Sequence, residues 1–287
     1  MALNVGQAAV ATAMSEIVER GLYADEIFQD GITFTSEHDV DNAGQIQVAV
    51  YSPDNSIEPK IPGSDFTNSE FANTVININT NNSFQKSQKV PAYVQATMPN
   101  DVLMEKVLSV TEDIRIAFQK TALAVLVNEG TVSDDTDIIT AANIKEKVLA
   151  MRKELRKKHA RPDVVIASVD EYSTMLEIAG KDYTPITNES VITTGRLGYW
   201  MGMLWVEATL LGGTYKYNNI SGVAQPVDTS TTGLIMYDHK AYSIIPKVTM
   251  LRVIDNPNAA GSLVQVEVDA GFKITNQACA LVKKISG

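Results

Sequence analysis

Apolar and polar residues alternate in two segments of the first third of the chain. In GQIQVAVY, residues 44–51, the apolar positions fall on one face, and VININTN, residues 75–81, repeats the period of two. This alternation is typical of half-buried β-strands. A polar stretch rich in proline separates the segments, so we predict a long two-stranded arm, with KVPAYV, residues 89–94, as a third strand. Because a lone two-stranded ribbon is marginal in water, the arm needs another surface on which to lie.

The strongest helical pattern of the chain covers residues 101–129. Mostly apolar positions recur three and four residues apart, as on one face of an α-helix. They are Leu103, Val107, Val110, Ile114, Ala117, Thr121 and Ala124. Asn100 or Asp101 can cap the start, and Gly130 stands where a left-handed residue ends a helix. A helix of about 42 Å, at about 1.5 Å per residue, is long enough to act as a strut.

Two shorter helices are also predicted. One covers Val5–Arg20 and stops at Gly21; the other follows Thr140, which can act as its N-cap. The apolar face of the second helix consists of Ile144, Val148, Met151 and Leu155. Its last turns hold the cations Arg152, Lys153, Arg156, Lys157 and Lys158, followed by His159. These cations complement the helix dipole, and a nucleic-acid patch is the sharper alternative.

The second half of the chain is dominated by predicted strands. RPDVVIAS, residues 161–168, is typical of a buried strand, and the capping box Ser168–Glu171 then opens a short helix that Gly180 closes. Further strands are predicted for GLIMYD, KVTMLRVI, LVQVEVDAGFKI and CALVKK. The turn-rich link DNPNAAGS joins the second and third of these, which predicts a long β-hairpin.

The segment Gly195–Gly213, GRLGYWMGMLWVEATLLGG, contains both tryptophans of the chain. We expect Gly198 and Gly202 to let a short helical turn pack closely against the following strand. Trp200 and Trp205 would then fill core space or space between subunits.

Composition narrows the class of protein. The chain has 287 residues, of which 45% are hydrophobic and 20% charged, as in a soluble globular protein. It has no apolar run long enough for a membrane-spanning helix, and its opening residues do not resemble a secretory signal. The net charge of −10 disfavours tight binding to nucleic-acid phosphates. Cys279 is the one cysteine, so no intrachain disulfide forms, and we expect it to be buried and inert.

A search for chemistry yields no catalytic, cofactor-binding or metal-binding residue. His38, His159 and His239 have no spacing typical of a zinc site, and we expect His239 in a surface turn. No nucleophile elbow, phosphate-binding loop or dinucleotide fingerprint is present. Three aspartates could suggest calcium but lack the other positions of an EF-hand, which favours a solvated loop. They are Asp134, Asp135 and Asp137.

The order of these parts resembles the major capsid proteins of tailed bacteriophages, which have the HK97 fold. DVVIASVDEYSTML is similar to the strand–helix element of that family, and Gly195-Arg-Leu-Gly198 with Gly202 looks like its G-x-(I/L)-G-x-x-x-G turn. The resemblance implies an α+β fold with an N-arm, an extended E-loop, a P-domain with a long spine helix, and an α/β A-domain. The implied boundaries are 1–35 for the N-arm, 36–98 for the E-loop, 99–130 for the spine helix, 131–244 for the A-domain, 245–270 for the P-domain hairpin and 271–287 for the return to the A-domain.

The function implied by the resemblance is structural and not enzymatic. Copies would self-assemble into the pentamers and hexamers of an icosahedral virion that encloses double-stranded DNA without sequence-specific binding. Assembly would take place in the bacterial host cytoplasm, with scaffolding, portal or decoration proteins as further partners. No long charged helical prefix is present, so we expect any scaffold to be cleaved or separate. Some members of the family crosslink a lysine to an asparagine; Lys60 and Asn256 or Asn258 lie in corresponding regions, but no motif fixes such a pair.

Two other functions remain open from the sequence. An encapsulin, the shell protein of a cellular compartment, shares the fold and would carry an inner groove for cargo. An α/β hydrolase or transferase that uses His239 or His159 belongs to a different class, and the lack of a recognisable catalytic partner is the main objection to it.

Overall fold

The computed structural model describes Ile27 and residues 45–51, 73–92, 102–182, 198–219, 221–258 and 260–285. The helix predicted over Val5–Arg20 lies outside these residues. So do His38, Lys60 and the proposed capping residues Asn100 and Asp101.

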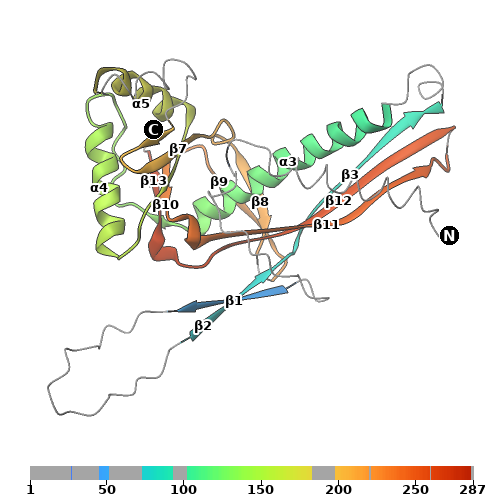
Figure 1. The fold of residues 1–287 in the computed structure, drawn as a ribbon, viewed down its shortest axis with the longest axis horizontal. Coiled ribbons are helices and arrows are strands. Elements are labelled where there is room, and N and C mark those ends of the chain that lie inside the picture. The colour runs from blue at the N-terminus through green and yellow to red at the C-terminus, as the bar shows by residue number, and fades with distance from the viewer. Residues whose placement is uncertain are drawn as a thin grey trace, which may run out of the picture.

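A long helix lying on a long β-hairpin forms the elongated half of the molecule (Figure 1). The helix, α3, is Val102–Glu129, and the hairpin consists of β11, Tyr242–Asp255, and β12, Gly261–Ile274. A third antiparallel strand, β3, Asn82–Pro91, pairs with β12, so the sheet order is β11-β12-β3. The predicted long helix and the predicted hairpin are both confirmed.

The alternation along β12 decides which face of this sheet meets the helix. Val264, Val266 and Val268 are buried against α3, while the residues between them point to the other face. The helix contributes Val107, Val110 and Ile114 to the same small core. The predicted stripe therefore faces the hairpin, as the spacing of three and four requires.

The last turns of α3 are buried on every side, which the one-sided stripe does not predict. All residues from Thr121 to Val127 are buried because the helix here enters the large core of the molecule. Phe118 stands at the entrance and contacts the rings of Phe84 and Phe272, at centroid distances of 6.0 and 5.0 Å. One helix thus serves as a strut at one end and as a core element at the other.

β3 differs from the strand predicted over residues 89–94. It begins at Asn82 and pairs with β12 from Ala270↔Asn82 to Gly261↔Pro91. The pattern conceals it because polar side chains interrupt the apolar face toward the helix: between Phe84 and Val90, Lys86 forms an ion pair with Asp113 of α3. The segment 82–91 therefore belongs to the hairpin sheet, although the resemblance had assigned it to the extended loop.

The predicted two-stranded arm is confirmed. β1, Gln45–Tyr51, pairs antiparallel with β2, Asn73–Asn79, from Gln45↔Asn79 to Tyr51↔Asn73. The ribbon leaves the body on one side of the molecule (Figure 1). At its base the Asn82 side chain accepts a hydrogen bond of 2.7 Å from the backbone N–H of Asn218, which ties the ribbon to the body.

The compact half of the molecule is built on a six-stranded mixed sheet of order β4-β13-β10-β5-β7-β6. The strands are β4, Thr131–Val132; β5, Val164–Ala167; β6, Tyr199–Trp200; β7, Met203–Glu207; β10, Thr232–Tyr237; and β13, Ala280–Lys284. Two helices, α4, Ile144–Lys157, and α5, Val169–Asp182, pack on one face, while the end of α3 packs on the other. Every residue of β5 and β10 is buried because both faces of the sheet are covered.

The ends of α4 and α5 depart from prediction. Asn143, and not Thr140, is the N-cap of α4, because a turn over residues 141–143 precedes the helix. At α5 the Ser168 hydroxyl accepts from the backbone N–H of Glu171 at 3.5 Å, which is one half of the predicted capping box. The other half is missing, because the backbone N–H of Ser168 donates to Gly233. α5 also continues past Gly180 to Asp182.

The glycines around Trp200 form a tight hairpin and not the predicted helical turn. β6 and β7 pair through Trp200↔Met203, which leaves Met201 and Gly202 as a two-residue loop. Both have positive φ, 55° and 75°, as a type I′ turn requires. A Cβ atom on Gly202 would meet nothing within 4 Å, so the glycine is needed for its backbone angle and not for close packing.

A second small hairpin was not predicted. β8, Thr214–Asn218, pairs with β9, Ala224–Asp228, and both contact α3. Two short 3₁₀ turns, His239–Ala241 and Gln277–Cys279, lie at the edge of the compact half.

Candidate assembly surfaces

His239 lies in the predicted turn and has a carboxylate partner that the sequence did not reveal. The His239 Nδ1 atom contacts the Asp163 side chain, and the His239 backbone N–H donates to the same carboxylate at 2.8 Å. Asp163 is 76 residues earlier in the chain and stands just before β5. Only the pairing of β5 with β10 brings the two together, so no spacing rule could have found them.

A second carboxylate, that of Asp238, completes a cluster whose possible ligand atoms lie within 4.8 Å of one another: Asp163, Asp238 and His239. These carboxylates already accept hydrogen bonds from the chain, since Asp238 accepts from the backbone N–H groups of Lys240 and Arg161 at 3.1 and 3.3 Å. Four cationic side chains line the same hollow. This arrangement suits an anion better than a metal cation.

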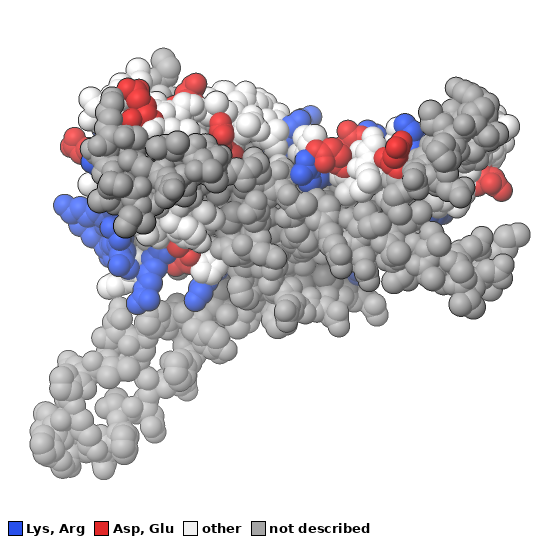
Figure 2. Space-filling model, turned by 45° about the horizontal axis from the view of Figure 1, so that its top comes forward, with Lys and Arg blue, Asp and Glu red and all other residues white. Residues whose placement is uncertain are grey.

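The hollow itself has a volume of about 350 Å³ and lies at the end of the sheet where β5 and β7 begin. We call it the basic hollow, and its lining residues are Arg152, Arg156, Arg161, Pro162, Asp163, Gly202, Asp238, His239 and Lys240. Two of its cations come from the predicted basic run at the end of α4, and two come from other segments. Basic side chains gather at this lower left part of the body in Figure 2.

His159, the other described histidine, is part of a helix cap. Its φ is 62°, and its backbone N–H donates to Arg156 at 3.1 Å, while that of Ala160 donates to Leu155 at 3.1 Å. These are the two hydrogen bonds of a Schellman motif, in which the left-handed position is usually glycine.

Of the three aspartates before α4, Asp134 and Asp137 are exposed in a loop, as predicted, while Asp135 is half-buried and tethered by ion pairs. Asp135 forms ion pairs with Lys147 of α4 at 2.9 Å and with the fully buried Lys283 of β13 at 3.1 Å. Lys283 also donates to the backbone carbonyl of Asp135 at 2.9 Å. Partial burial alone would raise the pKa of Asp135, but the hydrogen bonds from Lys147, the Asp137 backbone and Lys283 outweigh it and lower this pKa to about 2.

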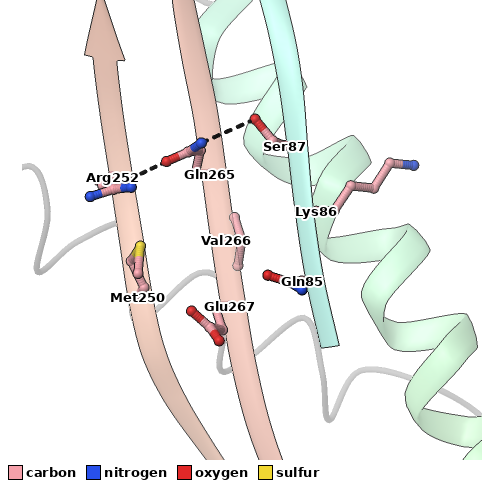
Figure 3. Close-up of a pocket in the computed structure, with 8 residues that line it drawn as sticks. All are labelled: Gln85, Lys86, Ser87, Met250, Arg252, Gln265, Val266 and Glu267. Atoms are coloured by element: carbon pink, nitrogen blue, oxygen red, sulfur yellow. Dashed lines mark hydrogen bonds between the residues drawn. The ribbon is translucent and has the colours of Figure 1, made fainter. Parts of the chain in front are cut away.

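The face of the hairpin sheet that points away from α3 is polar and hollowed (Figure 3). The hollow has a volume of about 350 Å³, and a chain of hydrogen bonds crosses it from Arg252 to Gln265 at 2.7 Å and from Gln265 to Ser87 at 3.4 Å. Glu267 and Met250 flank this chain in Figure 3. A surface of this kind suits a polar partner.

The structure also describes the two tryptophans and the cysteine, whose burial was predicted from the sequence. Trp205 is buried and meets the half-buried Trp200 edge-on, with ring centroids 5.7 Å apart, so both serve the core of the subunit. Cys279 is half-buried and not fully buried as expected; burial and the charge of Asp238 raise the pKa of its thiol, which keeps it protonated.

The asparagines considered for crosslinking lie at the tip of the long hairpin. Asn256 accepts a hydrogen bond of 3.0 Å from the backbone N–H of Asn258, and Asn258 is exposed. Since Lys60 is outside the described residues, its pairing with either remains a prediction.

Within the described residues, no helix has the length and apolar character needed to cross a membrane. No family model matches the sequence, and no curated protein matches it.

Solved structures, in contrast, are similar to nearly the whole chain. The capsid structure of the cyanophage P-SCSP1u is matched with a TM-score of 0.66 and 10% identity, over 89% of this chain and 87% of that chain. The mature capsid of bacteriophage PhiM1 gives 0.58 and 14%, over 89% and 87%. The capsid of Ralstonia phage GP4 gives 0.59 and 8%, over 92% and 89%. The resemblance drawn from the sequence is therefore confirmed at the level of architecture: this chain has the α+β fold found in phage capsid structures.

Proposed function

We propose that the protein is the structural subunit of an icosahedral bacteriophage head. The observation that carries the proposal is a ribbon, β1–β2, that leaves the body, in a chain whose fold is that of phage capsid structures. A ribbon of two strands gains little stability alone. A neighbouring copy that lies beneath it would supply the missing packing, and in a symmetric assembly every copy would receive the same contact.

The parts of the HK97 fold can be assigned on this basis. We take α3 as the spine helix of the P-domain and the β11–β12 hairpin with β3 as its sheet. The six-stranded sheet with α4 and α5 would be the A-domain. The E-loop would start near Ser36 and end near Asn81, because the following strand pairs with β12 and so belongs to the P-domain. Residues 1–35 would be the N-arm.

Pentamers and hexamers of the subunit would enclose double-stranded DNA in the virion, after assembly in the host cytoplasm with scaffolding, portal or decoration proteins. A structural role without enzymatic activity is supported by the lining of the basic hollow. The His239–Asp163 pair resembles part of a hydrolase triad, but among the residues that the structure describes no serine, threonine or cysteine lines this hollow.

Electron microscopy and size-exclusion chromatography of the purified protein test the proposal. We expect rings or closed shells for the full chain. Replacement of residues 47–77 by a short glycine–serine linker keeps the buried Ile78 and should give a folded subunit that no longer forms shells, since this part of the ribbon leaves the body. A wild-type protein that remains monomeric at every salt and protein concentration would contradict the proposed function.

A further inference from the structure

The basic hollow contains cationic side chains that have no anionic partner among the described residues of the subunit. Arg156, Arg161 and Lys240 are exposed, and Arg152 is half-buried. Within the described residues, the side chains of these four form no hydrogen bond or ion pair. The two carboxylates in the hollow are occupied by His239 and by backbone N–H groups. The hollow can therefore bind an anion from outside the subunit.

The shape of the hollow favours a small anionic group over a nucleic-acid strand. Its cations come from the end of α4, the start of β5 and the turn after β10, and they line one recess of about 350 Å³. A strand of nucleic acid is usually bound along an extended basic groove that follows its backbone. The net charge of −10 adds a repulsion against a polyanion. Arginine forks pair well with individual carboxylates.

The opposite end of the same sheet carries such carboxylates. β5 and β7 run parallel, from Val164↔Leu204 to Ala167↔Glu207, so Glu207 and the first turn of α5 lie at the far end from the basic hollow. We call this far end, which includes Asp170, Glu207 and Asp228, the acidic end. Asp170 and Asp228 are exposed, and Lys284 offsets part of the charge there. Figure 2 shows acidic side chains along the upper left of the body and basic ones below them.

We propose that the basic hollow of one subunit binds carboxylate side chains from the acidic end of a second copy, which creates a head-to-tail contact around each ring. This inference rests on the proposed function. In Figure 1 the β1–β2 ribbon lies below the body, and α4, whose last turns line the basic hollow, is at the lower left of the same body. A neighbour that approaches this side would meet the ribbon and the hollow together. Head-to-tail contacts of this kind generate closed rings when the rotation from one copy to the next closes on itself.

Charge reversal tests the contact in the full-length protein. The basic-end variant is Arg156→Glu with Arg161→Glu, and the acidic-end variant is Asp170→Lys with Glu207→Lys. We expect each variant to fold, as shown by circular dichroism, and to need a protein concentration at least about tenfold higher for ring formation. The matched control, Lys153→Glu with Lys157→Glu, makes the same change of charge on α4 at positions that do not line the hollow, and it should assemble like wild type.

A mixture of the two variants gives the sharper result. One variant is acidic at both ends and the other is basic at both, so they can alternate around a ring. We expect an equimolar mixture to regain assembly at wild-type concentration, with both variants in equal amounts by native mass spectrometry. Alternation requires an even number of subunits, so hexamers should form and pentamers should not.

The possible failures separate the inference from the proposed function. If wild type assembles and both variants assemble equally well, the inference is wrong and the proposed function stands. If the mixture fails to assemble although wild type does, the occupant is not the acidic end. Should wild type bind a short DNA duplex while the basic-end variant does not, with assembly unchanged, the hollow is a nucleic-acid contact instead. A wild type that never assembles overturns the proposed function itself.

Discussion

A residue type in this protein can be explained by the backbone conformation at its position and not by the chemistry of its side chain. His159 is the best example, because a histidine near a basic run invites a functional explanation. The structure places it in the left-handed position of a Schellman motif, where an L-residue is strained and glycine is not. The stability of the helix end therefore depends on the backbone conformation of this position and not on its imidazole.

Replacement of His159 by glycine should accordingly stabilise the subunit. Glycine removes the strain of the left-handed conformation, and we expect a gain of about 0.5–1 kcal/mol in the free energy of unfolding, measured with urea. His159→Ala is the control, since it removes the imidazole but keeps a Cβ atom. If alanine stabilises as much as glycine, the backbone explanation is wrong.

The Asp135–Lys283 ion pair, unlike His159, stabilises the fold through the charges of its side chains. Asp135→Asn leaves the buried ammonium of Lys283 without its counterion, and we expect a loss of about 3 kcal/mol at pH 7. Asp135→Asn combined with Lys283→Met should recover much of this loss, because the unpaired charge is then gone. A double variant as unstable as the single one would contradict the assignment.

The same pair predicts how stability depends on pH. The pKa of Asp135 is lowered to about 2 in the folded chain, from about 3.9 for an unperturbed aspartate. Its stabilising contribution is therefore fully present above about pH 4 and is lost as the pH falls toward 2. The difference in unfolding free energy between wild type and Asp135→Asn should stay constant from pH 7 to pH 5 and shrink at lower pH. A difference that already shrinks between pH 7 and pH 5 would exclude this carboxylate as the source.

Elements were predictable where one periodicity governed a whole segment. α3 and β12 follow the periods of 3.6 and 2 where they pack against each other, and both appear as predicted. β3 did not, because polar side chains such as Lys86 face the helix and break the apolar alternation. The Met201–Gly202 turn was assigned the wrong geometry, because a glycine signals a special φ without saying which turn uses it.

At the same scale, Phe118 anchors α3 to the hairpin sheet. Its ring contacts aromatic side chains of both β3 and β12. Phe118→Ala should cost about 3–5 kcal/mol through lost packing and the cavity left behind, measured by thermal or urea unfolding. Leu108→Ala, on the exposed side of the same helix, should cost less than about 0.5 kcal/mol. Equal effects at the two positions would mean that the helix does not depend on this aromatic cluster.

For the whole molecule, the order of elements was predictable and the contacts between distant segments were not. The long helix, the arm and the hairpin each leave a local trace in the sequence. The basic hollow leaves none, because its cations come from residues near 152–161 and near 240 and meet only after β5 and β10 pair. The acidic end is likewise assembled from separate segments. The net charge of −10 is a sum over the whole chain, so it does not show that the basic hollow and the acidic end carry opposite charges.

The six-stranded sheet also has very short edge strands. Its outermost strands, β4 and β6, are only two residues long, so neither offers a continuous row of free backbone groups to another chain. Edge-to-edge pairing of two subunits through this sheet is therefore disfavoured, and the long edge strand β11 of the hairpin sheet is the place where a second chain would find a continuous row of backbone groups.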